Sequence, residues 1–273
     1  MGSVCAQTAS QPGAPTAAAE APSSTEDWTK KGQEQLKAGQ FQEASQSFEE
    51  AVRLDGNNIE AKLGLASACV KLWVTGGKSP LAEESYFRAR NTLLAVLDQE
   101  PENKKALASL ARIALERATS LADRKALNEG LDEARAWNLR LIAIDPGDVA
   151  AEYALGVIAW TRCIGPESQS HNLAIVKRSG AAPLATQARL NYQVACREPV
   201  EEGIRYLSKV VEADKDSDAS MGYLGALYKM KASYEESPED AQRDRELSNE
   251  WTAKAEAAKK SRANSGSPTP QNP

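Results

Sequence analysis

Hydrophobic positions along the chain recur at helical spacing, and turn residues interrupt them at intervals. In residues 131–148, LDEARAWNLRLIAIDPGD, the side chains of Ala134, Trp137 and Leu141 fall on one side of a helix, and Asp-Pro-Gly then ends it. A single occurrence would predict only a helix and a turn. The pattern recurs along the chain, however, so its repetition decides the prediction of the fold.

Four sets of residues share one spacing, with successive intervals of four, three and five positions. They are Ala44, Phe48, Ala51 and Gly56; Ala89, Leu93, Val96 and Pro101; Ala134, Asn138, Leu141 and Pro146; and Gly203, Leu207, Val210 and Lys215. A second helical pattern follows each turn and carries Leu65-Ala66, Leu110-Ala111, Leu155-Gly156 or Leu224-Gly225. Because a small residue beside leucine lets a neighbouring helix approach closely, the sequence predicts pairs of helices that stack on one another.

These residues resemble the tetratricopeptide repeat (TPR), in which a helix with Trp, Leu-Gly and an aromatic residue precedes a helix with Ala, Phe and Ala, followed by Pro. The first unit is nearly complete, with Trp28, Gly32, Gly39, Phe41, Ala44, Phe48 and Ala51. The resemblance covers residues 25–262 and implies an all-α fold, a right-handed α-α superhelix of about five helix pairs. The long units look like those of exported bacterial TPR proteins of unassigned role.

The repeat period differs from the family's usual value of about 34 residues. Ala44, Ala89 and Ala134 follow one another at 45 residues, and Gly203 comes 69 residues after Ala134. We therefore expect lengthened helices and loops in units two and three, and an insertion at about 163–199 in unit four. Such an insertion is either a functional loop or a structural plug over the groove.

Both ends of the chain differ in composition from the repeats. Residues 1–24 consist mainly of small and polar residues, and residues 263–273 are similar, so neither segment can offset its ordering entropy by burial. We expect two disordered tails flanking the solenoid at 25–262. Val4-Cys5-Ala6 resembles a signal-cleavage site, although the apolar segment of a signal peptide is absent from this chain. A periplasmic or secreted protein is therefore expected, with a cytoplasmic one as the alternative.

Charge and hydropathy narrow the class of partner. The formal net charge is −5, and Lys and Arg are interspersed with Asp and Glu, so no basic face for nucleic acid is expected. The longest apolar runs, such as 153–160, are far shorter than the roughly 18 residues that span a bilayer. We expect Trp251 and the charged helix 241–260 to cap the solenoid, whereas an exposed apolar end would instead predict a homodimer. A monomer or a weak homodimer is therefore expected.

The resemblance to TPR proteins implies that the first helix of every unit lines a concave groove that binds a peptide or a protein surface. In some members a clamp of Lys and Asn side chains binds the C-terminal carboxylate of heat-shock chaperones. The matching positions here hold Thr29, Gln33, Gly64, Lys105 and Ser109, and only Lys105 fits the clamp. We therefore do not expect that partner.

Aromatic residues mark the most distinctive part of the expected groove. Tyr153, Val157 and Trp160 fall on one face of the first helix of unit four, and aromatic side chains with a polar tip are typical of interface hot spots. The alternative is that they pack against the insertion or a neighbouring helix. The cationic candidates on or near the groove are Lys71, Arg112 and Lys229. These could bind acidic groups, or they could belong to a solvated face.

Two cysteines, Cys163 and Cys196, bound the insertion. In an exported protein a disulfide between them would join the base of the loop. The alternative is that Cys163 is a free, buried residue of an extended helix. Non-reducing mass spectrometry distinguishes the two.

Candidate chemistry is sparse. The single histidine, His171, is expected on a surface loop without a catalytic partner, so we expect no catalytic residues. No Cys or His pair has the spacing of a zinc site, and Gly76-Gly77-Lys78-Ser79 lacks the earlier glycine and the strand of a phosphate-binding loop. We therefore expect no metal and no cofactor.

Three functions are compatible with the sequence. The first is a non-enzymatic scaffold that binds a protein or peptide in its concave face near Tyr153 and Trp160. The second is a structural subunit of a cell-envelope or secretion assembly that binds through its ends or through the insertion. The third is an enzyme that uses the insertion, which would need acidic or hydroxyl groups converging beside His171.

Overall fold

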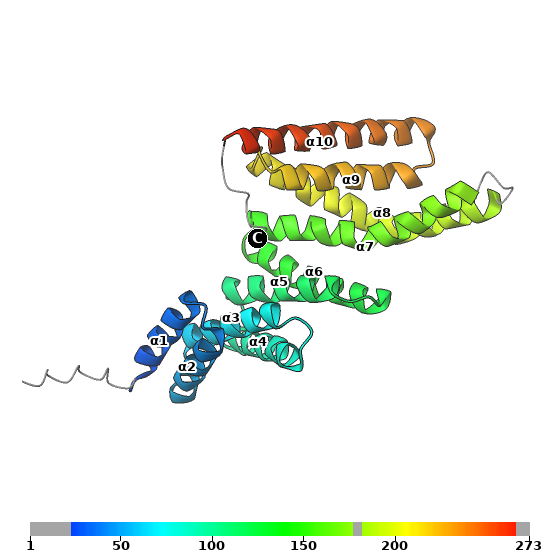
Figure 1. Ribbon diagram of the computed structural model, residues 1–273. Coiled ribbons are helices and arrows are strands. Elements are labelled where there is room, and N and C mark those ends of the chain that lie inside the picture. Colours follow the sequence, from blue (N-terminus) through cyan, green and yellow to red (C-terminus); the bar gives the residue numbers. More distant parts are fainter. Residues whose placement is uncertain (1–22, 177–181, 266–273) are drawn as a thin grey trace, which may run out of the picture.

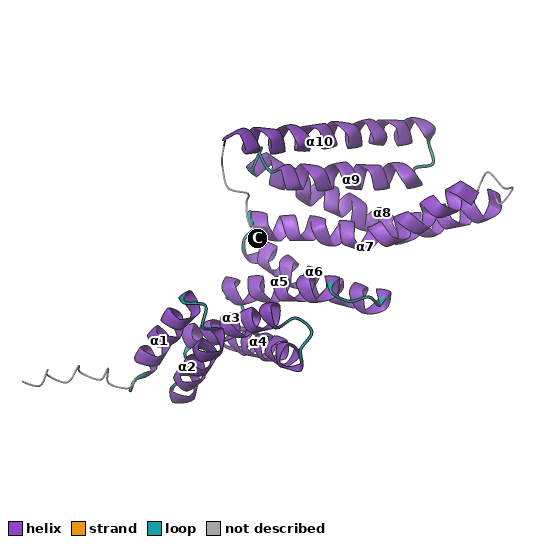
Figure 2. Cartoon of the chain, in the orientation of Figure 1, coloured by secondary structure: helices purple, strands orange, loops and turns teal. Residues whose placement is uncertain are grey.

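The computed structural model describes residues 23–176 and 182–265, which form ten α-helices (Figure 1). They are α1 (Thr25–Lys37), α2 (Phe41–Leu54), α3 (Ile59–Gly76), α4 (Pro80–Gln99), α5 (Lys104–Thr119), α6 (Arg124–Ile144), α7 (Val149–Val176), α8 (Ala182–Ala213), α9 (Asp218–Tyr234) and α10 (Pro238–Ser265). No strand occurs in these residues (Figure 2). Consecutive helices pack in pairs, and the pairs stack from α1–α2 to α9–α10 (Figure 1). The all-α prediction of about five helix pairs is confirmed.

The helices begin where polar side chains can cap them. Seven residues accept a hydrogen bond from the backbone N–H three positions later, at 2.8–3.2 Å: Ser24, Asn58, Ser79, Asn103, Asp123, Asp148 and Ser237. The Asp-Pro-Gly turn combines an end and a start, because α6 stops before Pro146 while Asp148 caps α7. Local sequence therefore accounts for most helix boundaries.

Close approach of the helices depends on glycine facing one large side chain. Phe48 of α2 is fully buried, and a Cβ atom added to Gly32 of α1 or to Gly64 of α3 would collide with its ring. Leu207 of α8 similarly occupies the space that a Cβ at Gly156 of α7 would need. In units one and four, the shared spacing thus places a large side chain of the second helix against a glycine of the first helix.

The buried side chains form two main cores along the stack. One lies among the helices of the first three units, where Phe48, Leu93 and Leu107 are fully buried. The other joins α7, α8, α9 and α10 around Leu207 and Leu227. A smaller cluster of α5, α6 and α7 residues lies between them. Contacts therefore run mainly between neighbouring pairs, as in a solenoid.

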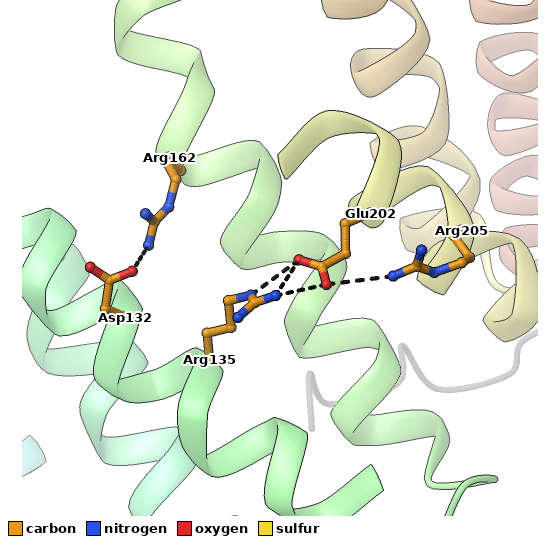
Figure 3. Close-up of polar contacts among 5 residues, drawn as sticks. All are labelled: Asp132, Arg135, Arg162, Glu202 and Arg205. Carbon is orange, nitrogen blue, oxygen red and sulfur yellow. Dashed lines mark hydrogen bonds and ion pairs between the residues drawn. The ribbon is translucent and has the colours of Figure 1, made fainter. Parts of the chain in front are cut away.

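Ion pairs connect the second helices of successive units. Arg90 of α4 pairs with Glu133 of α6 at 3.0 Å, and Arg135 of α6 forms a bidentate pair with Glu202 of α8 through its Nε and Nη2 atoms (Figure 3). In the sequence, each of these residues is adjacent to the small residue that begins the repeat spacing of its unit: Ala89, Ala134 or Gly203. Partly exposed pairs contribute about 0–1 kcal/mol each, so they orient the units while apolar packing provides most of the stability.

The insertion expected at 163–199 is not a separate loop in the described residues. Helix α7 continues to Val176, so His171 lies within a helix, and the prediction that it sits on a loop is wrong. A proline at position 166 cannot donate a backbone hydrogen bond to the carbonyl of Arg162. That carbonyl accepts a hydrogen bond from the Arg124 guanidinium instead, so it is not left without a donor. The extra residues lengthen the α7–α8 hairpin.

The two expected tails fall largely outside the description. Residues 1–22 and 266–273 are not described, and α10 reaches Ser265, three residues beyond the end expected for the solenoid. No helix within 23–176 and 182–265 is long and apolar enough to cross a membrane.

Candidate functional site

A cavity of about 420 Å³ opens between the third and fourth helix pairs. Helices α5, α6 and α7 provide most of its lining, and Tyr223 of α9 contributes one side. The lining is mainly apolar, with Ala108 and Leu115 of α5 facing Ala154 and Val157 of α7. Its size and apolar lining with a few polar groups are typical of a ligand site.

Three aromatic residues meet at the α7–α9 side of the cavity. The ring of Tyr223 packs edge-on against Tyr153 and against Trp160, with centroids 5.9 and 5.2 Å apart. Tyr153 lines the cavity and packs against α9 at the same time, whereas Trp160 packs against α9 without lining it. Val157 also lines the cavity. Of the aromatic candidates, the structure therefore places Tyr153 in the cavity lining and Trp160 against the neighbouring core.

The ionisation of Tyr153 reports on this packing. Burial raises the pKa of Tyr153 from 10.0 to about 12, and the adjacent Tyr223 contributes. The neutral phenol of Tyr153 is favoured by the folded state, so its contribution to stability is fully present below the unfolded-state pKa of about 10. This contribution is lost as the pH rises toward about 12.

In an ultraviolet absorbance titration, we expect the difference between the native protein and Tyr153→Phe to show a phenol ionising well above pH 10. A difference curve centred near pH 10 would show that Tyr153 is solvated.

The cationic candidates do not converge. Arg112 lines the cavity, its side chain is 47% exposed, and it contacts Glu116 on the same helix at 3.5 Å. Lys71 of α3 and Lys229 of α9 are exposed and do not line the cavity. Asp148 also lines it, but its carboxylate caps α7 by accepting the Ala151 N–H at 2.9 Å. Arg112 is therefore the charged group most available to a ligand.

Among the residues that the sequence did not identify as part of the site, Asn138 and Tyr223 contribute polar side chains to the cavity. Asn138 of α6 is only 3% exposed and lines the cavity, and its Nδ2 atom donates to the carbonyl of Ala134 at 2.8 Å. Its position in the repeat is that of Phe48 in the first unit, so a polar residue at a core position was a visible signal. Tyr223 precedes the Leu224-Gly225 pair, but its contact with Tyr153 depends on how two units stack.

The two candidate cysteines are joined in the structure. Cys163 of α7 and Cys196 of α8 form a buried disulfide with Cα atoms 5.7 Å apart. Cys69 is a free, buried cysteine near Ser45, and burial raises the pKa of its thiol. The disulfide therefore connects the two helices of the lengthened hairpin.

Groups with metal-binding or catalytic chemistry are sparse in the described residues. There, no group of three His, Cys, Asp or Glu side chains is placed to hold a metal ion. The polar groups of the cavity are Ser109, Arg112, Asn138, Asp148 and the tyrosine hydroxyls. They offer hydrogen bonds and one positive charge to a ligand.

Comparisons with known proteins bear on the fold. No family model matches the chain, and no curated protein matches it. Among solved structures, MamA from Desulfovibrio magneticus RS-1 (residue 41 to the end) matches 87% of this chain and 96% of its own, at 18% identity and a TM-score of 0.56. YrrB, a TPR protein with an unusual peptide-binding site, matches 86% of this chain and 91% of its own, at 14% identity and a TM-score of 0.51. These similarities show the fold, a TPR-type helical solenoid.

Proposed function

We propose that this chain, a solenoid of the TPR type, is a non-enzymatic scaffold that binds a peptide or protein segment in the cavity between α5 and α7. The observation that carries the proposal is the cavity itself, which combines an apolar floor, an aromatic side and the available guanidinium of Arg112. The similarity in fold to YrrB, which has a peptide-binding site, supports it.

The groups around the cavity favour binding over catalysis. A nucleophile needs an adjacent base that is itself oriented by a third group. Ser109 is the one aliphatic hydroxyl in the lining of this cavity. The carboxylate in the lining, that of Asp148, already caps α7. Small alanines along α5 and α7 instead leave room for the side chains of a partner.

Filling the cavity tests the proposal. Ala154→Trp on α7 and Ala108→Trp on α5 would each place an indole in the cavity from opposite sides. For peptides selected from a displayed random library, we expect either variant to weaken binding at least about 10-fold, the equivalent of 1.4 kcal/mol. The readout is the dissociation constant from fluorescence anisotropy.

Ala136→Trp provides the matched control, because Ala136 is exposed on α6 and does not line the cavity. Circular dichroism should show unchanged helix content in all three variants. If both cavity variants bind as tightly as the control, the cavity is not the binding site.

A second candidate is a structural subunit that docks through the lengthened α7–α8 hairpin. The observation that favours it is Val194 of α8, which is 87% exposed, with Leu190 also exposed one turn earlier. In that case Val194→Asp should prevent assembly with the partner in a pull-down experiment, whereas Ala154→Trp should leave assembly intact. The reverse outcome would favour the cavity.

A further inference from the structure

Asn138 occupies a position that large apolar side chains fill in the other units with the same spacing. Phe48, Leu93 and Leu207 are the corresponding residues of units one, two and four, and each is almost completely buried. Asn138 is buried to the same degree but is shorter and polar. Unit three therefore breaks the packing rule of its neighbours, and natural proteins tend to break such rules at functional sites.

Phe48, the equivalent residue of the first unit, shows how much space a large side chain fills at this position. The Phe48 ring fills the space between α1 and α3 so tightly that Gly32 and Gly64 could not carry a Cβ atom. The corresponding space in unit three lies beside Ala111 of α5 and Ala154 of α7, and both residues line the cavity together with Asn138. The cavity thus lies where a large side chain would close the fold, and α5 and α7 hardly touch there.

The Oδ1 atom of the Asn138 carboxamide is a hydrogen-bond acceptor available to a ligand. Its Nδ2 atom must be the one near the Ala134 carbonyl, because a carbonyl oxygen can only accept. Among the described residues no hydrogen bond to its Oδ1 atom occurs, and Oδ1 is not one of the fully buried polar atoms without a partner, so it borders the cavity, where water or a ligand can pair it. A ligand that displaces water from the cavity leaves this acceptor unpaired unless it brings a donor, so the cavity favours a ligand with a hydrogen-bond donor.

Arg112 adds a charge requirement to the same cavity. Its side chain lines the cavity, and its contact with Glu116 is an exposed pair at the long end of hydrogen-bonding distance. An exposed pair of this kind is weak, so the guanidinium can form a bidentate pair with a ligand carboxylate at little cost.

We propose that Asn138 keeps this position open for an aromatic side chain that carries a hydrogen-bond donor, tyrosine or tryptophan, in a peptide with an acidic residue beside it. The bound ring occupies the space that Phe48 fills in unit one, its O–H or N–H donates to Asn138, and the acidic residue pairs with Arg112. This assignment rests on the proposed binding function and specifies its ligand.

A displayed library of random heptapeptides is the probe. The wild-type chain should enrich tyrosine or tryptophan next to aspartate or glutamate, and Arg112→Glu should shift the neighbouring residue from acidic to basic. Equal enrichment of phenylalanine and tyrosine, or an acidic preference that survives Arg112→Glu, would overturn the assignment.

Asn138→Leu separates a ligand role from a structural one. Restoring the leucine of units two and four should weaken binding of the enriched peptides at least about 10-fold. Because leucine would fill the apolar space beside Ala111 and Ala154, the urea midpoint should stay the same or rise. Asn91→Leu, at an exposed position of α4, is the matched control and should change neither quantity.

The outcomes distinguish this inference from the proposed function. If Ala154→Trp abolishes binding while Asn138→Leu leaves it intact, the cavity binds peptides but Asn138 does not select them. A lower urea midpoint for Asn138→Leu would show that the asparagine stabilises the fold, and would also overturn the inference. If the wild-type chain enriches no peptide, both proposals fail together.

Discussion

Replacing Phe48 with alanine is expected to lower the free energy of unfolding by about 3–5 kcal/mol. The side chain is fully buried, and its ring packs against Gly32 and Gly64, which have no side chains to move into the vacated space. The cavity therefore cannot close without a shift of α1 or α3. Urea unfolding followed by circular dichroism measures the change.

Phe87→Ala is the matched control for this experiment. Phe87 is 52% exposed on α4, so its removal should cost less than about 1 kcal/mol. Because repeat proteins can unfold unit by unit, hydrogen exchange should show the loss concentrated in α1, α2 and α3. Equal destabilisation by the two substitutions would contradict the tight packing of Phe48.

Removing the disulfide between Cys163 and Cys196 is expected to lower the free energy of unfolding by about 3–4 kcal/mol in the chain-entropy account. The two residues are 33 positions apart, so the bond restricts a sizeable loop of the unfolded chain. The Cys163→Ala/Cys196→Ala variant, compared with the wild type without reductant, measures the effect.

Dithiothreitol provides the internal control. It should destabilise the wild type to the level of the double variant and leave that variant unchanged, because the buried Cys69 is not in a disulfide. A wild type that reductant does not affect, with free thiols at both Cys163 and Cys196 by non-reducing mass spectrometry, would show that the bond is absent in solution. Disulfides persist mainly in oxidising compartments, so we propose that this chain works outside the cytoplasm.

The repeat spacing was enough to predict the helix pairs. Ala44, Phe48 and Ala51 belong to a local pattern, and a helix buries the same face wherever that pattern recurs. Turns such as Asp-Pro-Gly after Ile144 were equally readable, since proline cannot continue a helix and aspartate can cap the next one. The period also indicated that the units were lengthened.

The structure of the insertion could not be predicted in the same way. Gly165-Pro166 suggested a break, yet α7 continues past it, and the carbonyl of Arg162 accepts a hydrogen bond from Arg124, 38 residues earlier in the sequence. The partner of Trp160 was equally hidden, because Tyr223 reaches it only through the stacking of α9 on α7. Such partners depend on distances between units, which a local pattern does not contain.

The amino-acid sequence by itself determined that this protein is a stack of paired helices, because helical periodicity, capping and small residues at contact positions all act within a few residues. Only the tertiary structure decided that Asn138, Arg112 and Tyr153 surround one cavity. That cavity exists because α5 and α7 are held apart where Asn138 is too short to fill the gap, and the width of a gap is set by the packing of all the helices around it.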